Sequence, residues 1–79
     1  MNKNPKILII GSTGELGTKL LKYCNNKEIN ITAITGFNNI KKLKSQKNKF
    51  KIKYSFLLSK KLDQLNFKKF LKIKKIDLV

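Results

Sequence analysis

The sequence predicts an α/β fold in which a parallel sheet lies between two layers of helices. Apolar, β-branched runs alternate with stretches of helical periodicity along the 79 residues, as in successive βαβ units with right-handed crossovers. The first run, residues 6–10 (KILII), is typical of a strand buried on both faces of a parallel sheet. A glycine-rich turn follows it directly. This length allows one small domain at most.

After the first strand, we expect a helix from Glu15 to about Tyr23. Its apolar positions recur at helical spacing and would face the sheet; they are Leu16, Leu20, Leu21 and Cys24. The turn-forming residues 25–27 end this helix. Residues 29–35 have the composition of a second strand, which Gly36 stops.

The second half of the chain repeats this alternation. Asn38 or Asn39 can cap a helix that runs to about residue 46, and residues 52–58 predict a third strand. Asp63 or Asn66 could cap a short third helix, which would carry the apolar residues Leu65, Phe67, Phe70 and Leu71. Residues 76–79 begin a fourth strand. Because the chain stops within this apolar run, we expect residues 1–79 to be the N-terminal part of a larger protein, truncated in its fourth strand.

The charge of the chain is high but does not by itself indicate a function. The 19 cations are all lysines, and four acids leave a formal net charge of +15. Lysines neutralise phosphates, so non-specific nucleic-acid binding is one alternative. Arginine, the usual reader of guanine edges, is absent, and the joint abundance of Lys, Asn and Ile indicates A/T-rich coding. No specific nucleic-acid partner is therefore expected.

The composition also excludes several kinds of catalytic site. There is no histidine, so this chain cannot form a Ser-His-Asp triad or a zinc site with histidine ligands. Cys24 is the only cysteine; it cannot form a disulfide within the chain, and it has no histidine to activate it. The four acids are scattered, so no metal site is expected. The longest apolar run, residues 7–10, is too short to span a membrane, which predicts a soluble cytoplasmic domain.

Three glycines mark the segment most closely tied to chemistry. Gly11, Gly14 and Gly17 lie between the first strand and the first helix, a context that predicts a dinucleotide-binding turn. Gly11 would form the tight turn, Gly14 would let the backbone approach a diphosphate, and Gly17 would let the helix pack closely on the strand. Thr13 adds a hydroxyl that could bind a phosphate oxygen or cap the helix. Glu15 should point to solvent, because its carboxylate would repel a diphosphate.

The end of the second strand indicates which dinucleotide is bound. NAD-binding sites usually place an acid there for the ribose 2′-hydroxyl, but residues 34–39 contain none, and Lys41 and Lys42 follow. This arrangement suits the 2′-phosphate of NADP. Phe37 could lie either against the adenine or in the core, and Asn38 could cap the next helix, bind the cofactor, or do both.

These segments resemble the start of the 1-deoxy-D-xylulose 5-phosphate reductoisomerase family. Residues 6–17 (KILIIGSTGELG) are similar to the opening strand of that family and to its Gly-Ser-Thr-Gly-Ser-Ile-Gly turn. Residues 31–39 (ITAITGFNN) resemble its second strand, which ends in a small residue followed by Gly, Lys and Asn. The later elements fall in the same order. The resemblance covers nearly the whole chain but only the first part of a full enzyme.

The resemblance implies a Rossmann-like NADPH-binding domain with cofactor contacts at Thr13, Gly14, Glu15, Leu16, Gly36, Phe37 and Asn38. The family usually has Ser at position 15 and often Lys at position 37, so here Lys41 or Lys42 would hold the 2′-phosphate. The full-length enzyme, a cytoplasmic homodimer, would isomerise 1-deoxy-D-xylulose 5-phosphate and reduce the product with NADPH to 2-C-methyl-D-erythritol 4-phosphate, in non-mevalonate isoprenoid biosynthesis. Its Mg²⁺ or Mn²⁺ site and its catalytic and C-terminal domains would lie beyond residue 79, so this fragment alone should be inactive.

Two other classes of protein remain as alternatives. The first is another NADP-dependent oxidoreductase, either an extended short-chain dehydrogenase or epimerase, or a semialdehyde dehydrogenase. The former needs a Tyr-x-x-x-Lys pair, a spacing that residues 54–61 (YSFLLSKK) lack, and the latter needs a catalytic cysteine further along the chain. The second is a small basic protein that binds nucleic acid without sequence preference.

Overall fold

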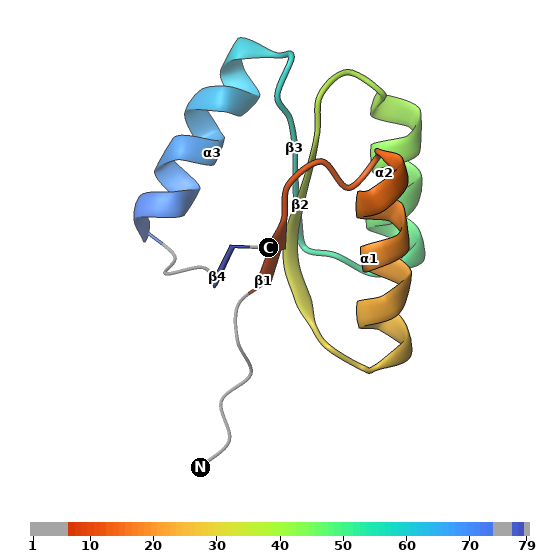
Figure 1. The fold of residues 1–79 in the computed structure, drawn as a ribbon. Helices are drawn as coiled ribbons and strands as arrows, with labels where there is room; N and C mark the ends of the chain where they lie inside the picture. The colour runs from red at the N-terminus through yellow and green to blue at the C-terminus, as the bar shows by residue number, and fades with distance from the viewer. Residues whose placement is uncertain (1–6, 74–76, 79) are drawn as a thin grey trace.

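The computed structural model describes residues 7–73 and 77–78, in which four strands and three helices alternate. In chain order these are β1 (Ile7–Ile9), α1 (Glu15–Asn26), β2 (Ile31–Gly36), α2 (Ile40–Lys49), β3 (Tyr54–Leu57), α3 (Lys61–Ile73) and β4 (Asp77–Leu78). The strands are all parallel and lie in the order β3-β2-β1-β4. Helices α1 and α2 cover one face of the sheet and α3 the other (Figure 1). The predicted three-layer α/β architecture, consistent with a partial Rossmann-like fold, is confirmed.

Consecutive strand residues pack on opposite faces of the sheet. Ile9, Ile34 and Leu57 belong to the core cluster on the side of α1 and α2, whereas their neighbours Leu8, Ala33 and Phe56 belong to the cluster beneath α3. Side chains of a strand point alternately to its two faces, so both faces of these strands are buried. The expectation drawn from the first apolar run is therefore correct for Leu8 and Ile9, whereas Ile7 is partly buried and Ile10 lies after the end of β1 and is 50% exposed. Lys6, Ile76 and Val79, which the predicted strands included, lie outside the described residues.

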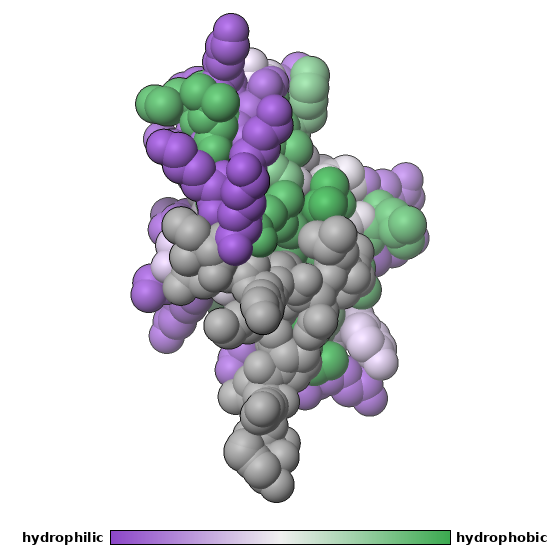
Figure 2. Space-filling model, turned by 90° about the vertical axis from the view of Figure 1, so that its left-hand side faces the viewer, coloured by the Kyte–Doolittle hydropathy of each residue, from purple (hydrophilic) through white to green (hydrophobic). Residues whose placement is uncertain are grey.

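Helix α3 packs on the sheet through aromatic rings. The ring centroid of Phe56 lies 5.3 Å from those of both Phe67 and Phe70, and Phe70 lies 4.9 Å from Tyr54, within the range of favourable tilted aromatic pairs. The apolar residues Leu62, Leu65 and Leu71 are exposed instead. Figure 2 looks onto this side of the molecule and shows apolar surface among the hydrophilic side chains.

The start of α3 differs from the prediction. The helix begins at Lys61, so neither Asp63 nor Asn66 is its cap. Asp63 lies in the first turn, and its Oδ2 accepts a hydrogen bond from the backbone N–H of Leu57 at 2.7 Å. The carboxylate of Asp63 therefore accepts from a strand N–H, a pairing that helix-capping rules do not predict.

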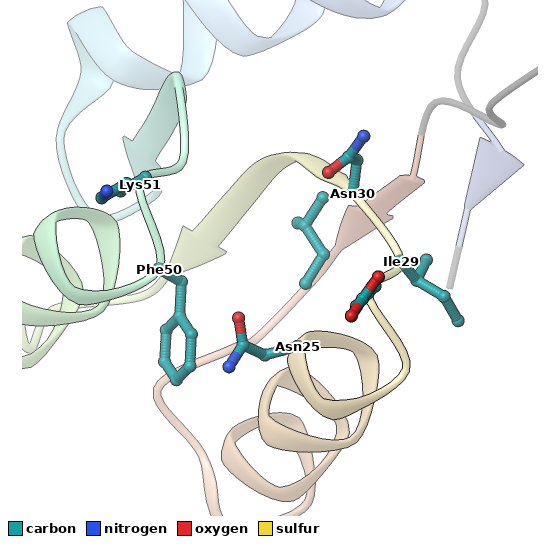
Figure 3. A pocket seen from close by; sticks show the side chains of 7 residues that line it. Asn25, Ile29, Asn30, Phe50 and Lys51 are labelled. Carbon is teal, nitrogen blue, oxygen red and sulfur yellow. The ribbon is translucent and has the colours of Figure 1, made fainter.

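Strands β2 and β3 begin two residues later than predicted, because helix ends occupy the residues before them. The N–H of Ile29 bonds to the carbonyl of Cys24 (2.8 Å), and the N–H of Ile52 bonds to that of Lys47 (2.9 Å). These are the long bonds of Schellman motifs, in which the residue before the long-bond donor has a positive φ. Here these residues are Glu28 (φ 58°) and Lys51 (φ 54°). Both line a hollow of about 290 Å³ at the amino end of the sheet, where Figure 3 labels Lys51.

Replacing Lys51 with Gly is expected to raise the free energy of unfolding by about 0.5–1 kcal/mol. A side chain in the left-handed region costs about 1–2 kcal/mol, which glycine avoids at some cost in unfolded-state entropy. The Lys51→Ala variant is the matched control, because it removes the same charge but keeps a Cβ at φ 54°. Urea denaturation of both variants measures the difference; equal stabilities would show that φ is not the source of strain.

Within the described ranges, no helix is long and apolar enough to cross a membrane.

Candidate functional site

The loops that follow β1, β2 and β3 lie together at the carboxyl ends of the strands, at the top of Figure 1. Hydrogen bonds tie these loops to one another. The N–H of Ser12, after β1, donates to the carbonyl of Thr35 in β2 (2.8 Å). The N–H groups of Leu58 and Ser59, after β3, donate to the carbonyls of Gly36 and Phe37, each at 2.8 Å. In open α/β sheets, this edge is where ligands bind.

Two of the three glycines have the structural roles predicted for them. Gly11 has a φ of +77°, in the region that favours glycine, and starts the turn. A Cβ on Gly17 would lie 2.1 Å from the carbonyl oxygen of Gly11 and 2.8 Å from the Cα of Ser12, so only glycine lets α1 approach the turn this closely. A Cβ on Gly14 would meet only the carbonyl oxygen of Gly11, at 3.5 Å. The backbone there is open, and contact of Gly14 with a diphosphate stays a prediction.

The start of α1 has free backbone donors. Its N-cap is Gly14, which has no side chain to cap the helix, so Thr13 is not the cap. No hydrogen bond from the N–H groups of Thr13, Glu15 or Leu16 reaches an acceptor among the described residues. Free N–H groups at a helix N-terminus favour a bound anion.

The carboxylate of Glu15 does not occupy this space. Its side chain is 89% exposed, and Oε2 lies 3.9 Å from Nζ of Lys19, one turn along the helix. The prediction that Glu15 points to solvent is confirmed. The N–H groups at the start of α1 therefore remain accessible to a ligand.

A buried polar network anchors the glycine turn to β2 and α2, and the sequence did not predict it. Gln46 of α2 donates from Nε2 to the carbonyl of Ser12 (2.8 Å), and its Oε1 accepts from the Ser12 hydroxyl (2.8 Å). The hydroxyl of Thr18 lies 3.1 Å from the same carbonyl, and the N–H of Gly11 donates to Oγ1 of Thr35 (3.0 Å). The only signal in the sequence is that Gln46 lies on the apolar side of α2, three residues after the buried Leu43.

Thr13 and Gly36 bring the glycine turn into contact with the end of β2. A Cβ on Gly36 would lie 3.0 Å from Cγ2 and 3.2 Å from Oγ1 of Thr13. The absence of a side chain at Gly36 therefore lets the threonine lie against the backbone of β2. The structure thus places these two predicted site residues side by side.

Phe37 and Asn38, directly after β2, are exposed. The exposed fraction of Phe37 is 67%, which rules out a core position for it. The helix cap is Asn39, whose Oδ1 accepts from the N–H of Lys42 (3.2 Å). Asn38 is therefore not the side-chain cap, and its amide has no hydrogen-bond partner within the described residues. Lys41 is exposed and Lys42 partly exposed in the first turn of α2.

An apolar hollow lies beside Phe37 and connects the end of β2 with α3. It has a volume of about 400 Å³ and is lined by Phe37, Leu58, Gln64, Phe67 and Lys68. Its walls are mainly the two aromatic rings and a leucine, and its polar groups are an amide and an ammonium. Such a hollow suits a flat, largely apolar ring.

Leu16 is the residue for which helical periodicity gave the wrong environment. It is 80% exposed at the start of α1, whereas Leu21 and Cys24, predicted on the same helix face, are buried. Leu16 lies beside the free N–H groups, where contact with a cofactor stays a prediction.

Over residues 7–73 and 77–78, no three side chains of Asp, Glu, Cys or His come together to hold a metal ion.

The parallel sheet and its glycine turn define part of a Rossmann-like α/β domain. The family model of 1-deoxy-D-xylulose 5-phosphate reductoisomerase matches residues 7–77 of the chain. The protein belongs to this family, which confirms the resemblance seen in the sequence. Members are oxidoreductases that act on a sugar phosphate, and their N-terminal domain binds NADPH. No curated protein matches the chain.

Proposed function

We propose that this chain binds NADPH at the carboxyl edge of its sheet, as the cofactor-binding part of a 1-deoxy-D-xylulose 5-phosphate reductoisomerase. The contacts would come from Thr13, Gly14, Glu15, Leu16, Gly36, Phe37 and Asn38. The observation that carries the proposal is the set of free N–H groups in the turn between β1 and α1, beside the exposed end of β2.

The diphosphate would lie on the start of α1. The N–H groups of Thr13, Glu15 and Leu16 supply donors, and the lack of a side chain at Gly14 leaves room for the phosphate oxygens. The partial positive charge of the helix terminus favours this anion. Glu15 would contribute through its backbone, since its carboxylate points away toward Lys19.

The adenosine half would lie at the end of β2. The exposed ring of Phe37 offers a face for the adenine, and the adjoining apolar hollow could receive its edge. No acid competes with a 2′-phosphate over residues 34–39. Lys41 or Lys42 would balance the charge of this phosphate, and the free amide of Asn38 could donate to the ribose or to the phosphate. These features favour NADPH over NADH.

When bound, NADPH supplies the hydride for reduction. The full-length enzyme would rearrange 1-deoxy-D-xylulose 5-phosphate and reduce the aldehyde to 2-C-methyl-D-erythritol 4-phosphate, in the non-mevalonate route to isoprenoids. We assign no catalytic residue and no metal ligand to this chain, because the described acids do not gather. The Mg²⁺ or Mn²⁺ and the substrate would be held by further domains of a cytoplasmic homodimer. This chain alone is therefore expected to bind NADPH without turnover.

Titration of the 79-residue chain with NADPH, followed by the fluorescence of the reduced nicotinamide, tests the proposal. We expect saturable binding that is at least about tenfold tighter than that of NADH, equivalent to about 1.4 kcal/mol. A parallel titration with duplex DNA tests the alternative suggested by the net charge of +15. Binding of DNA with a steep dependence on salt, without saturable NADPH binding at physiological salt, would contradict the proposal.

A further inference from the structure

Gln46 is a polar residue in a position that the packing of α2 would otherwise give to an apolar one. Only 6% of its surface is exposed, and Leu43, one turn earlier, belongs to the apolar core. Burying an amide is unfavourable unless its donors and acceptor are paired. Both ends of this amide pair with Ser12, 34 positions earlier in the chain, and Nε2 also donates to the Thr18 hydroxyl at 3.4 Å.

The two bonds fix the orientation of Ser12. The carbonyl of Ser12 can only accept, so it faces Nε2 of Gln46 at 2.8 Å, and the Ser12 hydroxyl then donates to Oε1 at 2.8 Å. The N–H of Ser12 is held by the carbonyl of Thr35 at 2.8 Å. All three polar groups of Ser12 are therefore anchored in the protein interior.

The peptide bond between Ser12 and Thr13 transmits this orientation to the turn. The bond is trans, as are all the described peptide bonds, and in a trans peptide the carbonyl and the N–H point in opposite directions. With the carbonyl of Ser12 held toward Gln46, the N–H of Thr13 is directed away from the interior. It has no acceptor among the described residues, which is the state expected of a donor kept available for a ligand.

We propose that Gln46 is a positioning residue for the cofactor: through Ser12, it holds the N–H of Thr13 in the orientation that binds the diphosphate. The proposal rests on the proposed function of the glycine turn. Gln46 makes no contact with the ligand. Its contribution is preorganisation, since a turn that is already ordered loses less entropy when the cofactor binds.

The Gln46→Met variant of the full chain tests the proposal, because it keeps an unbranched side chain of similar size and removes both hydrogen bonds to Ser12, together with the longer one to the Thr18 hydroxyl. We expect its dissociation constant for NADPH to rise about tenfold, at a temperature where the protein remains folded. Amide hydrogen exchange of Ser12 and Gly14, which are hydrogen-bonded in the turn, should accelerate more than that of β2. A purely structural role would accelerate all of these amides equally.

Ile52→Val is the matched control. Ile52 is buried in the same apolar cluster as Leu43, the neighbour of Gln46 on α2, but it lies beyond the C-terminal end of that helix, away from the glycine turn. It should lower stability and leave NADPH affinity within about twofold. If the Gln46→Met chain does not fold, Ser12→Ala replaces it. This variant removes the bond of the Ser12 hydroxyl to Oε1 of Gln46 and its longer contact of 3.3 Å with the carbonyl of Thr35, but it keeps the bond from Nε2 of Gln46 to the carbonyl of residue 12. We therefore expect a threefold to fivefold loss of affinity.

The outcomes separate this inference from the function on which it rests. If the parent binds NADPH and Gln46→Met binds it equally well, the positioning role is wrong and the proposed function stands. If the parent does not bind NADPH, the proposed function fails and this inference fails with it. Weaker binding by Gln46→Met, with unchanged binding by Ile52→Val, supports both.

Discussion

Replacing Gly17 with Ala is expected to lower the free energy of unfolding by about 2–3 kcal/mol. The added Cβ would lie 2.1 Å from the carbonyl oxygen of Gly11 and 2.8 Å from the Cα of Ser12. Both neighbours are backbone atoms of a turn anchored to β2, so they cannot rotate away as a flexible side chain would. Overpacking typically costs about 1–3 kcal/mol and occasionally more. Contacts this short with backbone atoms place the cost at about 3–4 kcal/mol, of which the better helix propensity of Ala offsets about 1 kcal/mol. Urea denaturation, monitored by circular dichroism, measures the loss.

Gly14→Ala is the control for this prediction, because it makes the same chemical change three residues earlier. Its Cβ would meet only one atom, at 3.5 Å, so the loss should stay below about 1 kcal/mol, the size of a capping effect. Equal losses for the two variants would show that close packing of α1 against the turn does not explain the glycine at position 17.

The sequence was sufficient to predict the parts of the fold that depend on periodicity and spacing. The alternation of apolar runs with helical patterns predicted the parallel sheet and its two helical layers. The three glycines at fixed spacing predicted both the tight turn at Gly11, where φ is positive, and the close approach at Gly17. These features depend on interactions between residues close in sequence, or on the steric demands of a single residue.

Features that depend on the rotation and docking of whole helices were not predictable in this way. The pairing of Gln46 with Ser12 spans 34 residues and requires α2 to present its amide at one particular point of the turn. The bond of Asp63 to the N–H of Leu57 likewise replaces a helix cap with a contact to a strand. Helical periodicity placed Leu16 on the buried face, but at the first turn of α1 that side chain is 80% exposed.

The helix ends show a further limit of local rules. A glycine or asparagine is the usual signal for the left-handed residue that closes a helix, yet Glu28 and Lys51 occupy those positions. The strands were therefore predicted to begin too early, at the isoleucines that complete the two helix ends. At the end of α2, the burial of Ile52 in the core compensates for the unfavourable backbone conformation of Lys51, and this burial is a tertiary interaction.

Replacing Gly14 with Asp is expected to weaken NADPH binding by at least about tenfold without destabilising the fold. The backbone of Gly14 is extended, with φ −74° and ψ 173°, a conformation open to any residue, and a Cβ there makes only an ordinary contact. Aspartate is among the best N-cap residues, so the free energy of unfolding should stay equal or rise by a few tenths of a kcal/mol. The same carboxylate would repel the diphosphate, and at a few ångströms near a protein surface a pair of like charges costs about 1–4 kcal/mol.

The Gly14→Asn variant separates the effect of the negative charge from the effect of helix capping. The Asn side chain has the same shape as that of Asp and caps the same N–H groups, but it carries no charge. Fluorescence titration of both variants with NADPH should show a smaller loss for Asn than for Asp. If the Asp variant bound NADPH as tightly as the parent, the diphosphate would not lie on this turn, and the contacts proposed for Thr13, Gly14 and Leu16 would be wrong. If Asn weakened binding as much as Asp, occupation of the free N–H groups would explain the loss, and the same groups would still identify the diphosphate site.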